Sequence, residues 1–325
     1  MPLPFLSLEL YTTLLIVVVA LFFTVSLCAS YIILFKTPTH LQAYKYNFLL
    51  LIFWYQVAVF CAGLFGRLDV EFFDEGVFCA TLYGPVQYFG LPAAYVELFI
   101  ILTSLVNIVN SLFFSFLYRY HHICRPTSLY ATNLRWRTFI KTVVFLGSAI
   151  FGAMYVISVI TTNPRQIDST NGQVEFCHSG SPLMYTCFLL FCCYFTAVFV
   201  FAALFTILII RTNRLNPKAS KKTVELRRML TITLVVSAVL PAVFGGIPMA
   251  VGVYAVITHV QQFTSIFRIC IIVCVFQGIL QSAATLMKDG VMLAIGRDVQ
   301  GNILTLNCHG TAASFRVTSD RSLAN

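Results

Sequence analysis

The third long apolar segment of the chain reads VQYFGLPAAYVELFIILTSLVNIVNSLFFSFLYR, from Val86 to Arg119. Its only charged residues are Glu97 and Arg119. A helix of about 34 residues, at 1.5 Å per residue, is near 50 Å long, whereas the hydrocarbon core of a bilayer is about 30 Å thick. We therefore expect a transmembrane helix that tilts or that projects beyond the lipid.

The rest of the chain has the same apolar character. Over its 325 residues the mean hydropathy is +0.86 and only 10% of the residues are charged, whereas soluble domains have about 25%. Six further segments are long enough to span a bilayer: Leu8–Phe35, Tyr46–Phe65, Phe139–Ile160, Leu183–Ile210, Met229–Thr258 and Ile266–Met287. We therefore predict an all-α fold, a bundle of seven transmembrane helices in residues 1–287, followed by a tail in residues 288–325.

Basic residues are concentrated in the connections on one side of this bundle. The connections after the first, third and fifth segments and the tail, counted with Arg119 and Lys141 at the edges of the third connection, hold 18 of the 21 Lys and Arg residues. Because cytoplasmic loops are rich in these residues, we expect the N-terminus outside the cell and the C-terminus in the cytoplasm. The net charge of +9 is spread over these short loops, which indicates attraction to anionic lipid and not binding of nucleic acid.

Polar residues form a stripe along the third segment. At 100° per residue, an arc of about 120° contains the stripe: Glu97, Ser104, Asn107, Ser111, Ser115 and Arg119. Lipid cannot satisfy polar groups, so the stripe must face protein or water. Hydrogen bonds to neighbouring helices, at about 1 kcal/mol each, are an alternative to ligand binding for the serines and for Asn107.

Glu97 and Arg268 are the two clear charges within the spans, each in the outer third of its helix. A charge in the middle of a membrane helix costs about 2.5–3.5 kcal/mol, and somewhat less towards the ends. We therefore predict that Glu97 and Arg268 pair across the bundle and line a ligand site together with Ser104 and Asn107. The alternative is that the Arg268 side chain extends to the outer headgroups.

Only two of the eleven cysteines are expected outside the cell, Cys79 before the third segment and Cys177 before the fifth. The extracellular compartment is oxidising, so we predict a disulfide bond between them. Most other cysteines lie within spans, where Cys packs as a small apolar residue. No Cys or His pattern has the spacing of a zinc site, and we expect neither a metal nor a cofactor.

A basic stretch, SFLYRYHHICRP from Ser115 to Pro126, ends the third segment on the cytoplasmic side. It carries two arginines and two histidines without an acid. Attraction to anionic lipid, at about 1 kcal/mol per basic residue, accounts for most bases near a membrane. It does not explain why Arg119 lies between Tyr118 and Tyr120 at the mouth of the bundle.

Several stretches resemble the nematode serpentine chemoreceptors of the Str superfamily, most closely its Srh and Sri classes. The similar stretches cover most of the chain: KTPTHLQAYKYNFLLLIFWYQ, LYGPVQYFGLPAAYVELFI, LYRYHHIC, ELRRMLTITLVVSAVLPAVFGGIPMAV and FQGILQSAATLMKDG. Arg119 also matches the arginine of the third helix in rhodopsin-like receptors, but Tyr118 stands where those receptors have an acid. Lys288-Asp289-Gly290-Val291 stands where the family's seventh helix is followed by a Lys-Pro-Tyr-Arg-like sequence.

The resemblance implies a G-protein-coupled receptor for a small external chemical, an odorant or a pheromone, in the plasma membrane of a sensory cilium. It further implies that a heterotrimeric G protein binds the cytoplasmic face. The residues on that face are expected to be Arg119, Tyr120, Arg125, Arg227 and Arg228.

Two other classes of function are alternatives to a receptor. A channel or transporter would use the polar stripe as a permeation path, but further charges at mid-membrane or broken helices would then be expected. A membrane enzyme would need a cluster of histidines or a Ser/His/Asp set within the spans, and none of the six histidines is expected there.

Overall fold

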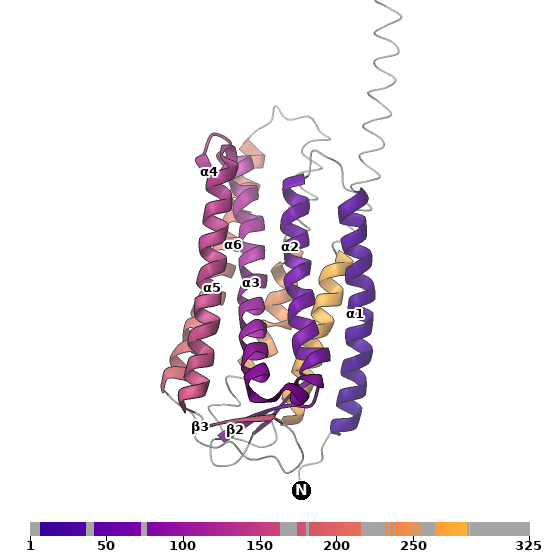
Figure 1. Cartoon of the computed structure of the whole chain (residues 1–325). Coiled ribbons are helices and arrows are strands. Elements are labelled where there is room, and N and C mark those ends of the chain that lie inside the picture. The colour runs from indigo at the N-terminus through magenta and orange to yellow at the C-terminus, as the bar shows by residue number, and fades with distance from the viewer. Residues whose placement is uncertain are drawn as a thin grey trace, which may run out of the picture.

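The computed structural model describes residues 7–36, 42–72, 77–162, 174–179, 182–215, 232, 235–236, 238–248, 250–251, 254, 264–284 and 286. These residues form a bundle of long helices with a small sheet at one end (Figure 1). Below, the end with the strands is called the sheet end and the opposite end the α4 end. The predicted tail, residues 288–325, lies outside the described residues, as do Arg227 and Arg228.

The helices account for the predicted spans. They are α1 (Leu8–Lys36), α2 (Gln42–Val59), α3 (Gly90–Cys124), α4 (Leu129–Thr132), α5 (Leu134–Thr162) and α6 (Pro182–Leu215), followed by helices at Ala238–Pro248 and Thr264–Ala284. Within the described residues, six helices are long and apolar enough to cross a membrane. The predicted span Met229–Thr258 lies partly outside the described residues, and the apolar helix Ala238–Pro248 is its longest described part.

Two short helical turns complete α2 and introduce α3. A π-helical turn, η2 (Phe60–Phe65), continues α2, and a 3₁₀ turn, η3 (Pro85–Phe89), precedes α3. Pro85 suits the first position of such a turn because its missing N–H would have no partner there. Gly90, with φ of 75°, joins η3 to α3, a backbone conformation that glycine adopts without steric cost.

The strands at the sheet end form a three-stranded antiparallel sheet, which differs from the all-α prediction. It consists of β1 (Leu68–Phe72), β2 (Val77–Leu82) and β3 (Val174–Ser179), in the order β1-β2-β3. The β2–β3 register places Cys79 opposite Cys177. The transmembrane part is helical as predicted, and the sheet belongs to the connections between helices.

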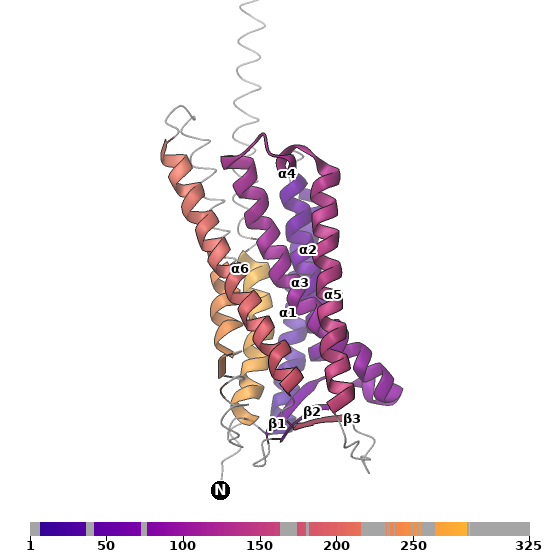
Figure 2. The same cartoon turned by 90° about the vertical axis from the view of Figure 1, so that its left-hand side faces the viewer.

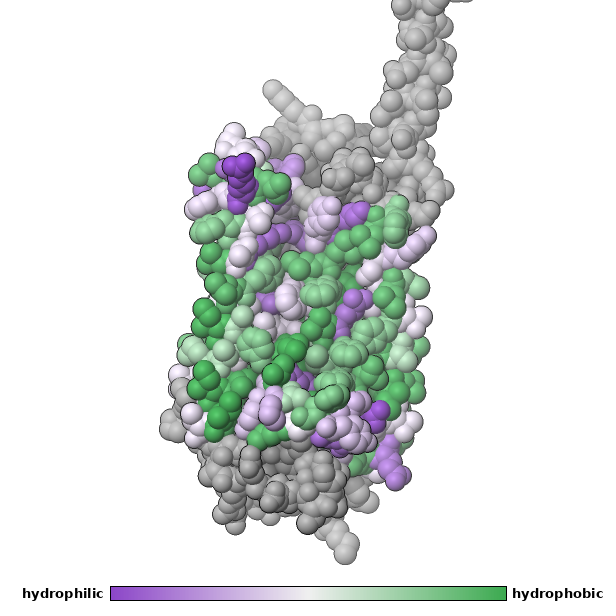
Figure 3. All heavy atoms as spheres, in the orientation of Figure 1, coloured by the Kyte–Doolittle hydropathy of each residue, from purple (hydrophilic) through white to green (hydrophobic). Residues whose placement is uncertain are grey.

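Helix α3 occupies the centre of the bundle. It contacts α2, α5 and α6, and Figure 2 shows it between α5 and α6. The outer helices turn apolar side chains outwards at helical spacing, as Val143, Leu146, Ile150 and Ile157 do on α5. Hydrophobic residues accordingly cover most of the middle of the face in Figure 3, as a lipid-facing surface requires.

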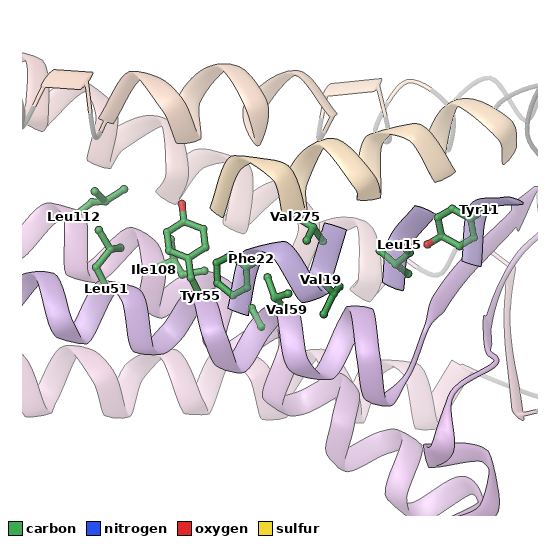
Figure 4. Packing of buried hydrophobic residues seen from close by; sticks show 11 residues of the cluster. Tyr11, Leu15, Val19, Phe22, Leu51, Tyr55, Val59, Ile108, Leu112 and Val275 are labelled. Carbon is green, nitrogen blue, oxygen red and sulfur yellow. The ribbon is translucent and has the colours of Figure 1, made fainter. Parts of the chain in front are cut away.

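The main buried cluster joins α1, α2, α3 and the helix Thr264–Ala284. Along α1, its members follow each other at intervals of three or four residues, which places them on one face: Tyr11, Leu15, Val19 and Phe22. They pack near Leu51, Tyr55 and Val59 of α2 and near Val275 (Figure 4). Lipid is as apolar as these side chains, so close van der Waals contact holds the helices together.

Candidate functional site

The polar stripe of α3 faces the interior of the bundle. Glu97, Ser104, Asn107, Ser111, Ser115 and Arg119 each expose at most 2% of their surface. The prediction that this stripe is buried, with Glu97 and Arg119 near opposite ends of one helix, is therefore confirmed. A buried polar face on a central helix provides groups for ligand contact and for contacts between helices.

In the middle of the bundle, two asparagines of α3 connect three helices. The side-chain oxygen of Asn107 accepts hydrogen bonds from the hydroxyl of Ser148 on α5 and from the amide of Asn110, the latter at 3.3 Å. The hydroxyl of Tyr194 on α6 donates to the side-chain oxygen of Asn110. Asn107 therefore joins helices, as the alternative in the sequence analysis proposed.

The serines at the next two turns bond within their own helix. The Ser111 hydroxyl donates to the Asn107 carbonyl at 2.7 Å, and the Ser115 hydroxyl donates to the Ser111 carbonyl at 2.8 Å. Such bonds satisfy a hydroxyl without a partner from another helix. These two serines are therefore weaker candidates for ligand contact than the residues nearer the sheet end.

Arg268 pairs with Asp69 of β1, and the prediction that it pairs with Glu97 is wrong. Its Nη2 lies 2.6 Å from Oδ2 of Asp69, and its Nε donates to Oδ1 at 2.8 Å. This two-point geometry matches the planar guanidinium to the carboxylate. The predicted pair joined two charges within the spans, but the partner of Arg268 is an acid of the connection that the sheet folds over the end of the bundle.

Tyr11 of α1 lies beside this ion pair. The Arg268 guanidinium carbon is 5.9 Å from the centre of the Tyr11 ring, close enough for a cation–π interaction. The Tyr11 hydroxyl donates to the Leu68 carbonyl at 2.6 Å, and the Val70 N–H donates to Asp69 Oδ1 at 3.0 Å. The pair therefore links α1, β1 and the helix Thr264–Ala284.

Glu97 has a different environment from the one predicted. Only 2% of its surface is exposed, and neither carboxylate oxygen has a hydrogen-bond partner within the described residues. It lies against Gly66, directly after η2, where an added Cβ would be 2.5 Å from Oε1. Seven residues along α3, the buried hydroxyl of Ser104 likewise has no hydrogen-bond partner in the described part of the chain.

At the α4 end, the two tyrosines on either side of the buried Arg119 contact neighbouring helices. The neighbouring Tyr120 ring stacks on Phe205 of α6, with centroids 5.0 Å apart and planes at 22°. The guanidinium carbon of Arg137 on α5 lies 5.1 Å from the centre of the Tyr118 ring. Tyr118, which replaces the acid of rhodopsin-like receptors, thus connects α3 to α5 through a cation–π contact, whereas Arg125 is exposed.

A sequence model of the family described as "Serpentine type 7TM GPCR chemoreceptor Srh" matches residues 7–289. The chain belongs to the Srh family of chemoreceptors. This agrees with the resemblance seen in the sequence, and the family consists of receptors and not of enzymes. No curated protein matches the chain.

In this Srh receptor, the turn between α3 and α4 is held by side chains near Arg119. Nδ1 of His121 is 2.8 Å from the Ser128 hydroxyl oxygen, and that oxygen also accepts from the Ala131 N–H at the start of α4. The His121 ring packs on Tyr130 at 5.0 Å. Burial raises the pKa of Tyr130 to about 12.

The two cysteines predicted to form a disulfide bond lie in adjacent strands at the sheet end. Cys79 is disulfide-bonded, and its Cα is opposite that of Cys177 in the β2–β3 register. Within the described residues, no three His, Cys, Asp or Glu side chains gather as ligands for a metal ion. A disulfide between Cys79 and Cys177 would fasten the connection before α6 to the connection before α3.

Proposed function

We propose that this Srh receptor binds a small external chemical, such as an odorant or a pheromone, at the sheet end and activates a heterotrimeric G protein at the α4 end. The sheet end and the N-terminus face the outside of the plasma membrane, in a sensory cilium, and the C-terminus is cytoplasmic. Three basic residues near α4 support this orientation under the positive-inside rule: Arg125 before α4, and Arg135 and Arg137 at the start of α5.

The buried polar face of α3 is the observation that carries the proposal. One rigid helix bears Glu97 near the sheet end and Arg119 near the α4 end, both inside the bundle. A ligand shifts a receptor between two arrangements only if it binds one of them better. A central helix in contact with α2, α5 and α6 is well placed to transmit such a difference between the two ends.

The four residues of the proposed ligand site fall into two groups, those with a hydrogen-bond or ion-pair partner in the protein and those without one in the described residues. Arg268 is engaged by Asp69, and Asn107 by Ser148, so these two residues position the helices around the ligand. Glu97 and Ser104 have buried polar atoms without hydrogen-bond partners in the described residues. We therefore assign direct ligand contact to Glu97 and Ser104.

The G-protein site is proposed at the end of α3. Tyr120 contacts α6 through Phe205, so a movement of α6 changes the surroundings of Tyr120 and of its neighbour Arg119. The exposed Arg125 extends this surface. Arg227 and Arg228, which lie outside the described residues, are proposed to face the G protein as well.

Purified receptor in lipid nanodiscs tests the proposed function. It is expected to accelerate guanine nucleotide exchange on a Gα subunit when a member of a panel of odorants is added. Receptor in planar bilayers is expected to pass no current with the same chemicals. Chemically gated current without nucleotide exchange would replace the receptor with a channel that uses the polar stripe as its path.

A further inference from the structure

We propose that the ligand of this receptor carries a positive charge, and that an alkylammonium group of the ligand binds the carboxylate of Glu97. This inference rests on the proposed function above and names the chemical class of its ligand. Both oxygens of Glu97 are buried without hydrogen-bond partners within the described residues. A buried carboxylate is costly unless it is paired and hydrogen-bonded, and an ammonium group supplies both the charge and up to three N–H donors.

The cations at the sheet end do not fill this role. Within the described residues these are Arg268 and Arg67. Arg268 is bound at two points by Asp69, so that pair is already neutral. Arg67 follows Gly66 directly, yet it forms no ion pair with Glu97, and its Nε is buried without a hydrogen-bond partner in the described part of the chain. Among the side chains that the structure describes at the sheet end, Glu97 is therefore the buried acid without a paired cation.

The backbone around Glu97 is unusual. The π-helical turn η2 ends next to the carboxylate, and π-helical turns occur frequently at functional sites. The Gly66 N–H donates to the Cys61 carbonyl at 2.8 Å, and the Gly66 carbonyl accepts from Gly84 at 2.8 Å. A Cβ added at Gly66 would lie 2.5 Å from Oε1 of Glu97. The segment can approach the carboxylate this closely because Gly66 has no side chain. The carboxylate is therefore held in place by packing and not by a charge.

Ser104 gives the ligand a second contact and a direction. It lies on the same face of α3 as Glu97, about 10 Å further along the axis at 1.5 Å per residue, and its hydroxyl is buried without a hydrogen-bond partner within the described residues. Ile101, which is also buried, lies between them on this face. A small amine with an apolar body fits this order of groups, with its ammonium at Glu97 and its body directed towards Ser104.

The test compares molecules that differ only in the head group. Full-length receptor in nanodiscs is heated at pH 7 with n-hexylamine, 1-hexanol or hexanoate, and the midpoint of unfolding is followed against concentration. Hexylamine is expected to stabilise the receptor at concentrations at least tenfold lower than hexanol or hexanoate. Equal potency of amine and alcohol would overturn the proposal. It would also be overturned if sodium chloride alone stabilised the receptor saturably and, at saturation, removed the preference for hexylamine, because a sodium ion would then be the partner of Glu97.

Variants locate the effect at Glu97. Glu97→Gln, which keeps the shape of the side chain, is expected to weaken hexylamine binding at least tenfold, whereas Glu9→Gln, at an exposed acid of α1, leaves it unchanged. Gly66→Ala, which displaces the carboxylate, is expected to weaken it as well, and Gly147→Ala, with nothing within 4 Å of the added Cβ, is the matched control. Retention of the amine preference in Glu97→Gln would refute the assignment.

Arg67→Gln separates a ligand cation from an internal one. If Arg67 were the true partner of Glu97, its removal would strengthen amine binding markedly, and the proposal would be wrong. We expect a change of less than threefold. If other chemicals drive nucleotide exchange and amines do not, only this inference fails. If no chemical of any class drives exchange, the proposed function fails.

Discussion

Breaking the Asp69–Arg268 pair is expected to destabilise the receptor strongly. Asp69 is fully buried and the Arg268 side chain is only 9% exposed, so removing one partner leaves the other charge buried and uncompensated. Loss of one partner of a buried ion pair costs about 3–5 kcal/mol. Asp69→Asn and Arg268→Gln should each lower the unfolding midpoint by roughly 6–10 °C, at about 2 °C per kcal/mol for a chain of this size.

A double-mutant cycle measures the pair itself. We expect the combined Asp69→Asn and Arg268→Gln variant to be no less stable than either single variant, which corresponds to a coupling energy of about 3–5 kcal/mol. Glu97→Gln combined with Arg268→Gln should show additive effects to within about 0.5 kcal/mol. The assay is thermal unfolding of purified receptor in nanodiscs, with Glu9→Gln as the exposed control.

The cycle can also contradict this geometry. Additive losses for Asp69 and Arg268, with strong coupling between Glu97 and Arg268, would mean that the two acids have exchanged roles. In that case the sheet would not be anchored to the bundle through Asp69, and the uncompensated acid would be Asp69 instead of Glu97.

Three further predictions follow from other contacts. Gly152→Ala on α5 should lower the free energy of unfolding by about 1–3 kcal/mol, because the added Cβ would lie 2.5 Å from the Thr103 hydroxyl. The control Gly147→Ala on the same helix should be neutral or stabilising by up to about 1 kcal/mol. Equal unfolding midpoints for the two variants would show that α3 and α5 are further apart. Labelling of unreduced receptor with a thiol reagent should leave Cys79 and Cys177 unmodified, and modification of both without reductant would disprove the bridge. Arg119→Ala should abolish nucleotide exchange on Gα while ligand binding persists, and Arg135→Ala, at an exposed position, should retain exchange; similar losses in both variants would indicate a requirement for bulk positive charge.

The sequence was sufficient for the helical bundle and for the polar face of α3. Both follow from the bilayer, because lipid fixes the length of a span and excludes unsatisfied polar groups. Residues of one helix that recur every three or four positions must share a face, so the common burial of Glu97 and Arg119 could be predicted without the position of any other helix.

The partner of Arg268 could not be predicted in the same way. Depth in the membrane follows from the position in a helix, but the direction of a side chain around the bundle depends on how the helices pack. Asp69 lies in a five-residue strand, LDVEF, too short to stand out from a connection. The one local signal is the alternation of apolar and acidic residues in this strand, which is typical of a half-buried strand.

The central claim is that a chemical at the sheet end and a G protein at the α4 end both bind the same arrangement of the bundle more tightly than the other arrangement. Linkage requires that each then raises the affinity of the other by the same factor. The most direct measurement is the dissociation constant of an active chemical with and without nucleotide-free Gα. We predict that Gα tightens binding by about 5–150-fold and that Arg119→Ala removes the difference. An affinity that is the same in both conditions would contradict the claim.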